Sequence, residues 1–107
     1  MSGTIGPALA RVVSETVVTF RGTLRVEEVE QRPWASVTFS GARHRLRIVM
    51  DGVGAIGAAA DLLERLDDLE LPLPGRIMAD LALLAEGRSD DGRYASLELE
   101  ALTIDDA

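Results

Sequence analysis

The chain has 107 residues, of which 47% are hydrophobic and 27% charged, a composition typical of one globular domain spanning residues 1–107. It contains no cysteine, which excludes disulfides and thiolate-based metal or nucleophile chemistry. The 18 acidic residues outnumber the 11 basic ones and give a net charge of −7, so we expect this acidic protein to bind neither nucleic acid nor an anionic membrane surface.

All 11 basic residues are arginine, which excludes a lysine nucleophile and, with the abundance of Ala, Gly, Leu and Val, indicates a bacterial protein from a GC-rich coding sequence. The uncharged runs are shorter than a membrane span, and no basic segment precedes an apolar stretch at the N-terminus. We therefore expect a soluble, cytoplasmic protein, with flexible ends near residues 1–10 and 105–107.

Alternation of apolar and polar residues predicts strands over residues 18–26, 34–39 and 43–50. A change of phase at Glu27 and Glu28 predicts a bulge or the end of strand pairing before Val29. Because proline lacks the N–H that a strand ladder needs, Pro33 predicts a break between the first two strands.

Apolar residues at helical spacing predict one amphipathic helix over residues 55–66, with Asp51 placed to cap it. The segment 77–86 fits either a helix or a strand, and as a strand it would place on one face Ile77, Ala79, Leu81, Leu83 and Ala85. We favour a strand because a hairpin-type loop and a clear alternating strand over residues 94–104 follow it.

The expected order is therefore βββαββ, a two-layer α+β domain whose antiparallel sheet has about five strands and one covering helix. One helix covers only about half of such a sheet. The simplest cover for the rest is a second copy of the chain, so we expect a homo-oligomer, most simply a dimer.

Three glycines, Gly52, Gly54 and Gly57, lie between a predicted strand and the predicted helix, the local context of a nucleotide-binding loop. That loop also needs a parallel sheet and an acidic residue about 20 positions further on, and the sequence indicates neither. A structural turn is the favoured interpretation, and a small-ligand or nucleotide site over residues 52–57 is the alternative.

Arg43, Arg45 and Arg47 share one face of their predicted strand, so they form a candidate anion patch. Glu98 and Glu100 alternate in the same way on the last strand. Because opposite charges on neighbouring strands commonly pair across a sheet, we favour pairing over anion binding.

His44 is the only histidine, and it falls on the apolar side of its predicted strand. A partly buried, hydrogen-bonded histidine is favoured over a general base. Neighbouring acidic residues are interpreted as solvated surface, and we assign no catalytic residue, metal ligand or cofactor.

Trp34 lies on the polar side of its predicted strand, and Tyr94, Leu102 and Ile104 lie on the polar side of the last one. Trp34 either covers the edge of the core or anchors an interface, and the four residues together suggest a second buried surface. The leading hypothesis is therefore a non-catalytic protein that acts by homo-oligomerisation and by binding another protein. The alternatives are a protein that binds a ligand at the glycine-rich loop and an enzyme that uses His44 with a carboxylate.

Overall fold

The computed structural model describes residues 4–106, so parts of the two ends expected to be flexible, residues 1–3 and 107, lie outside the described residues. Its elements are α1 (Gly6–Thr16), β1 (Thr23–Ala35), β2 (Ser40–Asp51), α2 (Ala55–Glu64), the short 3-10 helix η1 (Leu66–Asp68), β3 (Arg76–Arg88) and β4 (Tyr94–Asp105).

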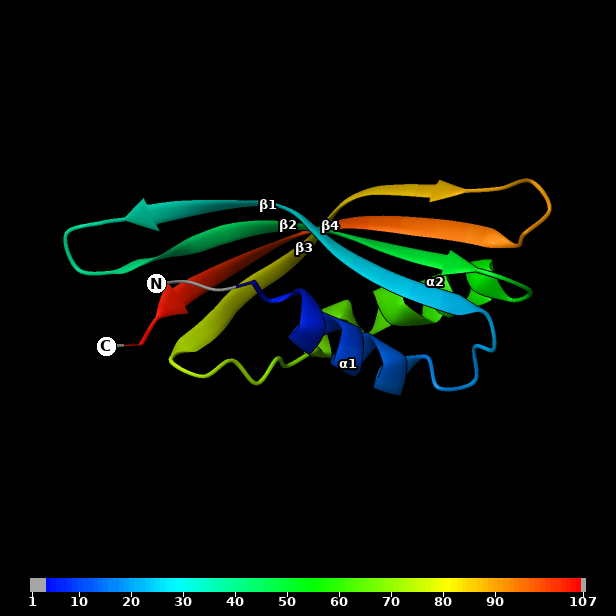
Figure 1. The fold of residues 1–107 in the computed structure, drawn as a ribbon, viewed down its shortest axis with the longest axis horizontal. Helices are drawn as coiled ribbons and strands as arrows, with labels where there is room; N and C mark the ends of the chain where they lie inside the picture. The colour runs from blue at the N-terminus through cyan, green and yellow to red at the C-terminus, as the bar shows by residue number, and fades with distance from the viewer. Residues whose placement is uncertain (1–3, 107) are drawn as a thin grey trace.

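The four strands form one antiparallel sheet in the order β1-β2-β4-β3, so β1 and β3 are its two edges. Both helices lie on the same face of the sheet (Figure 1). The predicted α+β class with an antiparallel sheet is confirmed. The predicted five strands and single helix in the order βββαββ are wrong, because the order is αββαββ with four strands and two helices.

The predicted break at Pro33 is wrong, and this error explains why five strands were predicted where the structure has four. β1 continues through Pro33, which pairs in register with Ala42 of β2. Because β1 is an edge strand, it tolerates a proline, whose missing N–H then costs no hydrogen bond within the sheet. The residues expected to form a second strand are instead the end of β1 and a hairpin turn, in which Ser36 N–H donates to the Phe39 carbonyl over 2.7 Å.

The first helix was not predicted, and residues 6–10, expected to be flexible, are part of it. α1 has Pro7 in its first turn, where a proline is compatible with a helix. Leu9 and Val13 are fully buried, and α1 packs along β1. The spacing of these apolar residues is the signal that identifies the helix.

Bulges change which residues share a face. The bulge predicted near Val29 is confirmed by a register shift between Glu28 and Glu30. β3 is a strand, as favoured, but it has two register shifts, one between Met78 and Asp80 and one between Leu83 and Ala85.

The expected single face of β3 is therefore wrong. Leu81 and Leu83 pair with Ala101 and Leu99 on the helix side, whereas Ile77 pairs with Ile104 on the other face. We call that other face, which no helix of residues 4–106 covers, the open face.

The core lies between the helices and the two central strands, and its fully buried members include Leu46, Leu99 and Leu62. α2 begins after Gly54, whose φ of 85° is in the left-handed region that glycine adopts readily. Gly54, not Asp51, is the N-cap residue, and no side chain caps this helix.

Candidate functional site

The open face carries a ladder of opposite charges across its two central strands. Arg47 of β2 donates to Glu98 of β4 over 2.9 Å, and Arg43 of β2 donates to Glu100 of β4 over 3.3 Å. The hydrogen bond that Arg47 donates to Glu98, followed by the negative charge of Glu98, raises the pKa of Arg47 above its usual value. The favoured cross-strand pairing of these arginines is therefore present in the structure.

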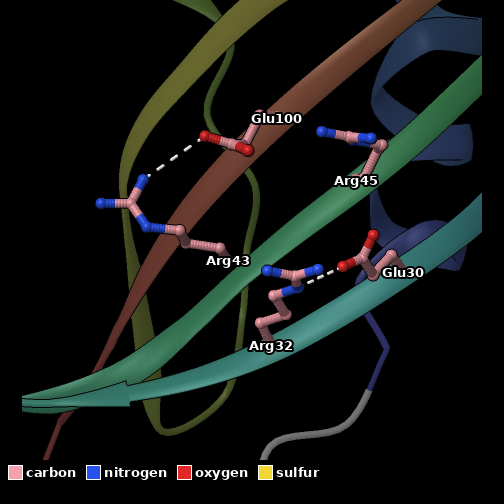
Figure 2. Close-up of a pocket in the computed structure, with 5 residues that line it drawn as sticks. All are labelled: Glu30, Arg32, Arg43, Arg45 and Glu100. Carbon is pink, nitrogen blue, oxygen red and sulfur yellow. Dashed lines mark hydrogen bonds and ion pairs between the residues drawn. The ribbon is translucent and has the colours of Figure 1, made fainter.

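The candidate anion patch does have one unpaired member. A hollow of about 170 Å³ on the open face is lined by Glu30, Arg32, Arg43, Arg45 and Glu100 (Figure 2). Arg32 pairs with Glu30 and Arg43 pairs with Glu100, whereas Arg45 makes no ion pair within residues 4–106. With three guanidinium groups against two carboxylates, the hollow suits one carboxylate better than a highly charged anion.

Apolar side chains gather at one end of the open face. Along one row of paired residues, Trp34 lies opposite Gly41, Gly41 opposite Ile104, and Ile104 opposite Ile77. Leu102 lies in the next row, opposite Asp80. We call Trp34, Ile77, Leu102 and Ile104 the apolar end cluster.

The fourth residue expected with Trp34 lies elsewhere. Tyr94 pairs with Asp51 at the opposite end of β4 from Ile104. At about 3.3 Å per strand residue, the two are roughly 30 Å apart along the strand. Tyr94 therefore does not belong to the apolar end cluster, and Ile77, which the expected face pattern of its segment placed elsewhere, takes its place.

The Trp34 side chain is partly buried on the open face. Its indole Nε1 is buried and has no hydrogen-bond partner within residues 4–106. An unpaired buried donor costs about 1–3 kcal/mol.

The glycine-rich loop lies at another hollow, between the end of α1 and one side of α2. This hollow has a volume of about 380 Å³, and its lining includes Gly54, Gly57, Phe20 and Arg65. Gly52 does not line it. An added Cβ at Gly52 would lie 2.8 Å from the backbone of Gly22, so its small size serves close backbone packing.

The most polar part of the interior centres on His44. His44 and Thr103 are fully buried, and the side chain of Glu28 is 8% exposed. His44 Nδ1 lies 3.2 Å from a Glu28 oxygen, and His44 Nε2 lies 3.0 Å from the Thr103 hydroxyl. Glu28 also accepts a 2.7 Å hydrogen bond from the backbone N–H of Ile5.

The donors in this network can be assigned. The Thr103 hydroxyl donates to the Ala42 carbonyl over 3.3 Å, so it accepts from His44 Nε2–H. The contact between His44 Nδ1 and Glu28 then also needs a proton, on one side or the other. His44 is thus buried and hydrogen-bonded, the favoured interpretation.

A hydroxyl, an imidazole and a carboxylate in series is also the arrangement of a nucleophilic hydrolase. Here Thr103 is fully buried, and its proton is directed at a backbone carbonyl. Neither His44 nor Thr103 lines any of five hollows on the surface of residues 4–106, although Glu28 lines one of them with Gly6 and Val26. These hydrogen bonds instead link the segment before α1 to the three strands β1, β2 and β4.

Glu28 and Thr103 were not identified from the sequence as partners of His44. They lie 16 and 59 positions away in the chain, so only the strand register brings them together. The one available signal was Thr103 on the otherwise apolar side of the last strand.

Within residues 4–106, no group of three or more acidic or histidine side chains is placed to hold a metal ion. None of the helices described has the length and apolarity to cross a membrane. A comparison with protein-family models finds no match, and a comparison with curated proteins finds none either. Function must therefore be inferred from the residues themselves.

Proposed function

We propose that this chain works in the cytoplasm as a non-catalytic interaction protein, which forms a homo-oligomer, most simply a dimer, and binds a further protein. The observation that carries the proposal is incomplete coverage of the sheet. Both helices lie on one face, where α1 packs mainly on β1, and α2 on β4 and β2. The open face and β3 are left for another protein to cover.

The uncovered surface is suited to protein rather than to a small molecule. The apolar end cluster adjoins paired arginines and glutamates, and an apolar centre with a charged, hydrogen-bonding rim is the usual anatomy of a protein interface. Tryptophan is enriched among residues that dominate binding energy. Trp34, in the same row of the open face as the exposed Ile77, is the residue we assign to anchoring the further protein.

The buried position of the only histidine supports the non-catalytic part of the proposal. A general base must come within hydrogen-bond distance of its substrate, and His44 is fully enclosed by the core. Two carboxylates of the open face, Glu98 and Glu100, pair with arginines in the ladder.

Sedimentation velocity with native mass spectrometry, over about a hundredfold range of protein concentration, tests self-association directly. We expect a species of twice the chain mass that dissociates on dilution. A monomer at every concentration would contradict the homo-oligomer.

A second candidate is binding of a small ligand at the start of α2, because Gly54 and Gly57 line the same hollow as Arg65. The antiparallel sheet does not provide the parallel framework of a dinucleotide site, and Asp61 lines the hollow as well as Arg65, so a compact ligand of low net charge fits better. Thermal denaturation with phosphate, ATP and NAD tests this candidate, since a ligand that binds the folded chain raises the midpoint. An added Cβ at Gly57 meets nothing within 4 Å, so Gly57→Ala should keep the fold and lose any such shift.

A further inference from the structure

The outer edge of β3 is the least protected part of the sheet. From Ile77 to Ala85 the strand has one charged residue, Asp80. Ile77 is 57% exposed, Leu84 46% and Leu83 36%. Among the helical elements, the one that β3 contacts most is the short η1.

An exposed, apolar edge strand pairs readily with a strand from another chain, because its outward N–H and C=O groups lack partners. A second copy of this chain offers the same edge with the same sequence. Whether two copies fit depends on the charges and on the faces that the pairing brings together.

We propose that two copies pair β3 with β3 in antiparallel orientation, centred on Leu81, and so form one continuous eight-stranded sheet. In this register Arg76 lies opposite Glu86 of the second copy. The two-fold symmetry repeats that opposite-charge pair at the other end of the interface. Leu81 meets Leu81 at the centre.

The faces of β3 also match in this register. Ile77 meets Ala85 of the second copy, and all four such residues lie on the open face, because Ile77 pairs with Ile104 and Ala85 with Glu98. Asp80 meets Ala82, again on the open face. The two bulges lie on either side of Leu81, which keeps these faces matched along the strand.

Neighbouring registers bring like charges together. Centring the pair on Asp80 places the two Asp80 carboxylates opposite each other. Centring it on Ala82 places Arg76 opposite Arg88, and centring it on Leu83 places Asp80 opposite Glu86. Because like charges directly opposite destabilise a strand pair, the charges favour Leu81 as the centre.

This inference rests on the proposed function, because it states which surface the second copy uses. Pairing through β3 leaves the open face accessible, and Trp34 lies on β1 at the opposite edge of the sheet. Self-association by some other surface would overturn the β3 pairing and leave the proposed homo-oligomer in place.

Cysteine cross-linking tests the register, since the chain has no cysteine of its own. Ile77→Cys and Ala85→Cys are made as separate chains and mixed in equal amounts under mild oxidation. Opposite residues of an antiparallel pair have Cα atoms about 4.5–5.5 Å apart, within the range of a disulfide. The control mixes Ile77→Cys with Ala82→Cys. Ala82 lies on the same face of β3 as Ala85 but about 10 Å away along the strand, so its cysteine would not lie opposite residue 77 of the second copy.

We expect the Ile77 and Ala85 mixture to form a covalent dimer at least about tenfold faster than the control mixture or either variant alone. Equal rates in all samples, with a dimer present by sedimentation, would overturn the β3 pairing alone. No cross-link and no dimer at any concentration would overturn both the pairing and the proposed homo-oligomer.

Charge reversal gives an independent test that needs no added cysteine. Glu86→Arg should weaken the dimer roughly tenfold, because two attractive pairs become repulsive. Adding Arg76→Glu should restore it. Unchanged dimer affinity in the single variant, or no recovery in the double variant, would overturn this register.

Discussion

β1 and β3 are the two edges of one sheet, and both are 13-residue strands, yet β1 carries more of the features that prevent an edge from pairing with another chain. β1 has charged residues along its length, a proline at Pro33, a bulge at Val29, and α1 packed along it. β3 has bulges but an apolar sequence, and no helix of comparable extent. The contrast indicates that β1 is built to remain an edge and that β3 is built to be covered.

The largest expected effect comes from weakening the cover on β1. Leu9 of α1 is fully buried, so Leu9→Ala should lower the free energy of unfolding by about 2–5 kcal/mol. Chemical denaturation measures it. Leu84→Ala on β3 is the matched control, because Leu84 is 46% exposed and its truncation should cost the isolated chain less than the loss of a fully buried leucine. Equal losses would mean that the two edges do not differ in cover.

A lysine on each edge sharpens the comparison for self-association. Leu84 and Val29 are both exposed apolar residues at bulges, one on β3 and one on β1. Leu84→Lys should weaken the dimer by about a hundredfold, because a lysine on an edge strand opposes pairing. Val29→Lys should leave its affinity unchanged in the same sedimentation experiment. A reversed result would place the interface on β1.

The buried network tests how the N-terminal segment is held against β1. Glu28→Ala leaves His44 Nδ1 and the Ile5 N–H without their partner and should cost about 1–3 kcal/mol in unfolding free energy. Glu28→Gln should cost less, because its carbonyl can accept from Ile5 while its amide donates to a neutral His44. Equal losses, measured by denaturation, would argue against this assignment of donors.

The smallest expected effect is on the pH dependence of stability, and it comes from the loop between β3 and β4. The hydrogen bond from Ser89, followed by that from the Arg93 N–H, lowers the pKa of Asp91. A lowered folded-state pKa gives stability that is present above the ordinary Asp value of about 3.9 and is lost as pH falls through the folded value. Asp91→Asn should therefore reduce the small pH dependence of stability in that acidic range. An identical pH profile in thermal denaturation would show that the loop contributes nothing.

The sequence was sufficient where local pattern decides structure. The strand at β4, the bulge near Val29 and the helix α2 follow from periodicity, and the pairing of Arg43 and Arg47 with Glu100 and Glu98 follows from matching charge alternation. The sequence was insufficient where the structure depends on the position of a strand within the sheet. Pro33 is compatible with β1 only because β1 is an edge, and edge position cannot be read from local residues.

The site residues divide in the same way. Trp34, Leu102 and Ile104 were grouped by their unexpected place on a polar face, and the strand register does place them at one end of the open face. Grouping Tyr94 with them used the face of the strand alone, although its sequence separation from Ile104 within one strand already places the two roughly 30 Å apart. Ile77 was missed because the bulges of β3 moved it to the other face.

Amide hydrogen exchange as a function of protein concentration tests the difference between the two edges most directly. If β3 pairs with a second copy while β1 remains an edge, backbone amides of β3 gain protection as the concentration rises and those of β1 do not change. Protection that is independent of concentration in β3, or that rises in β1 instead, would contradict the account.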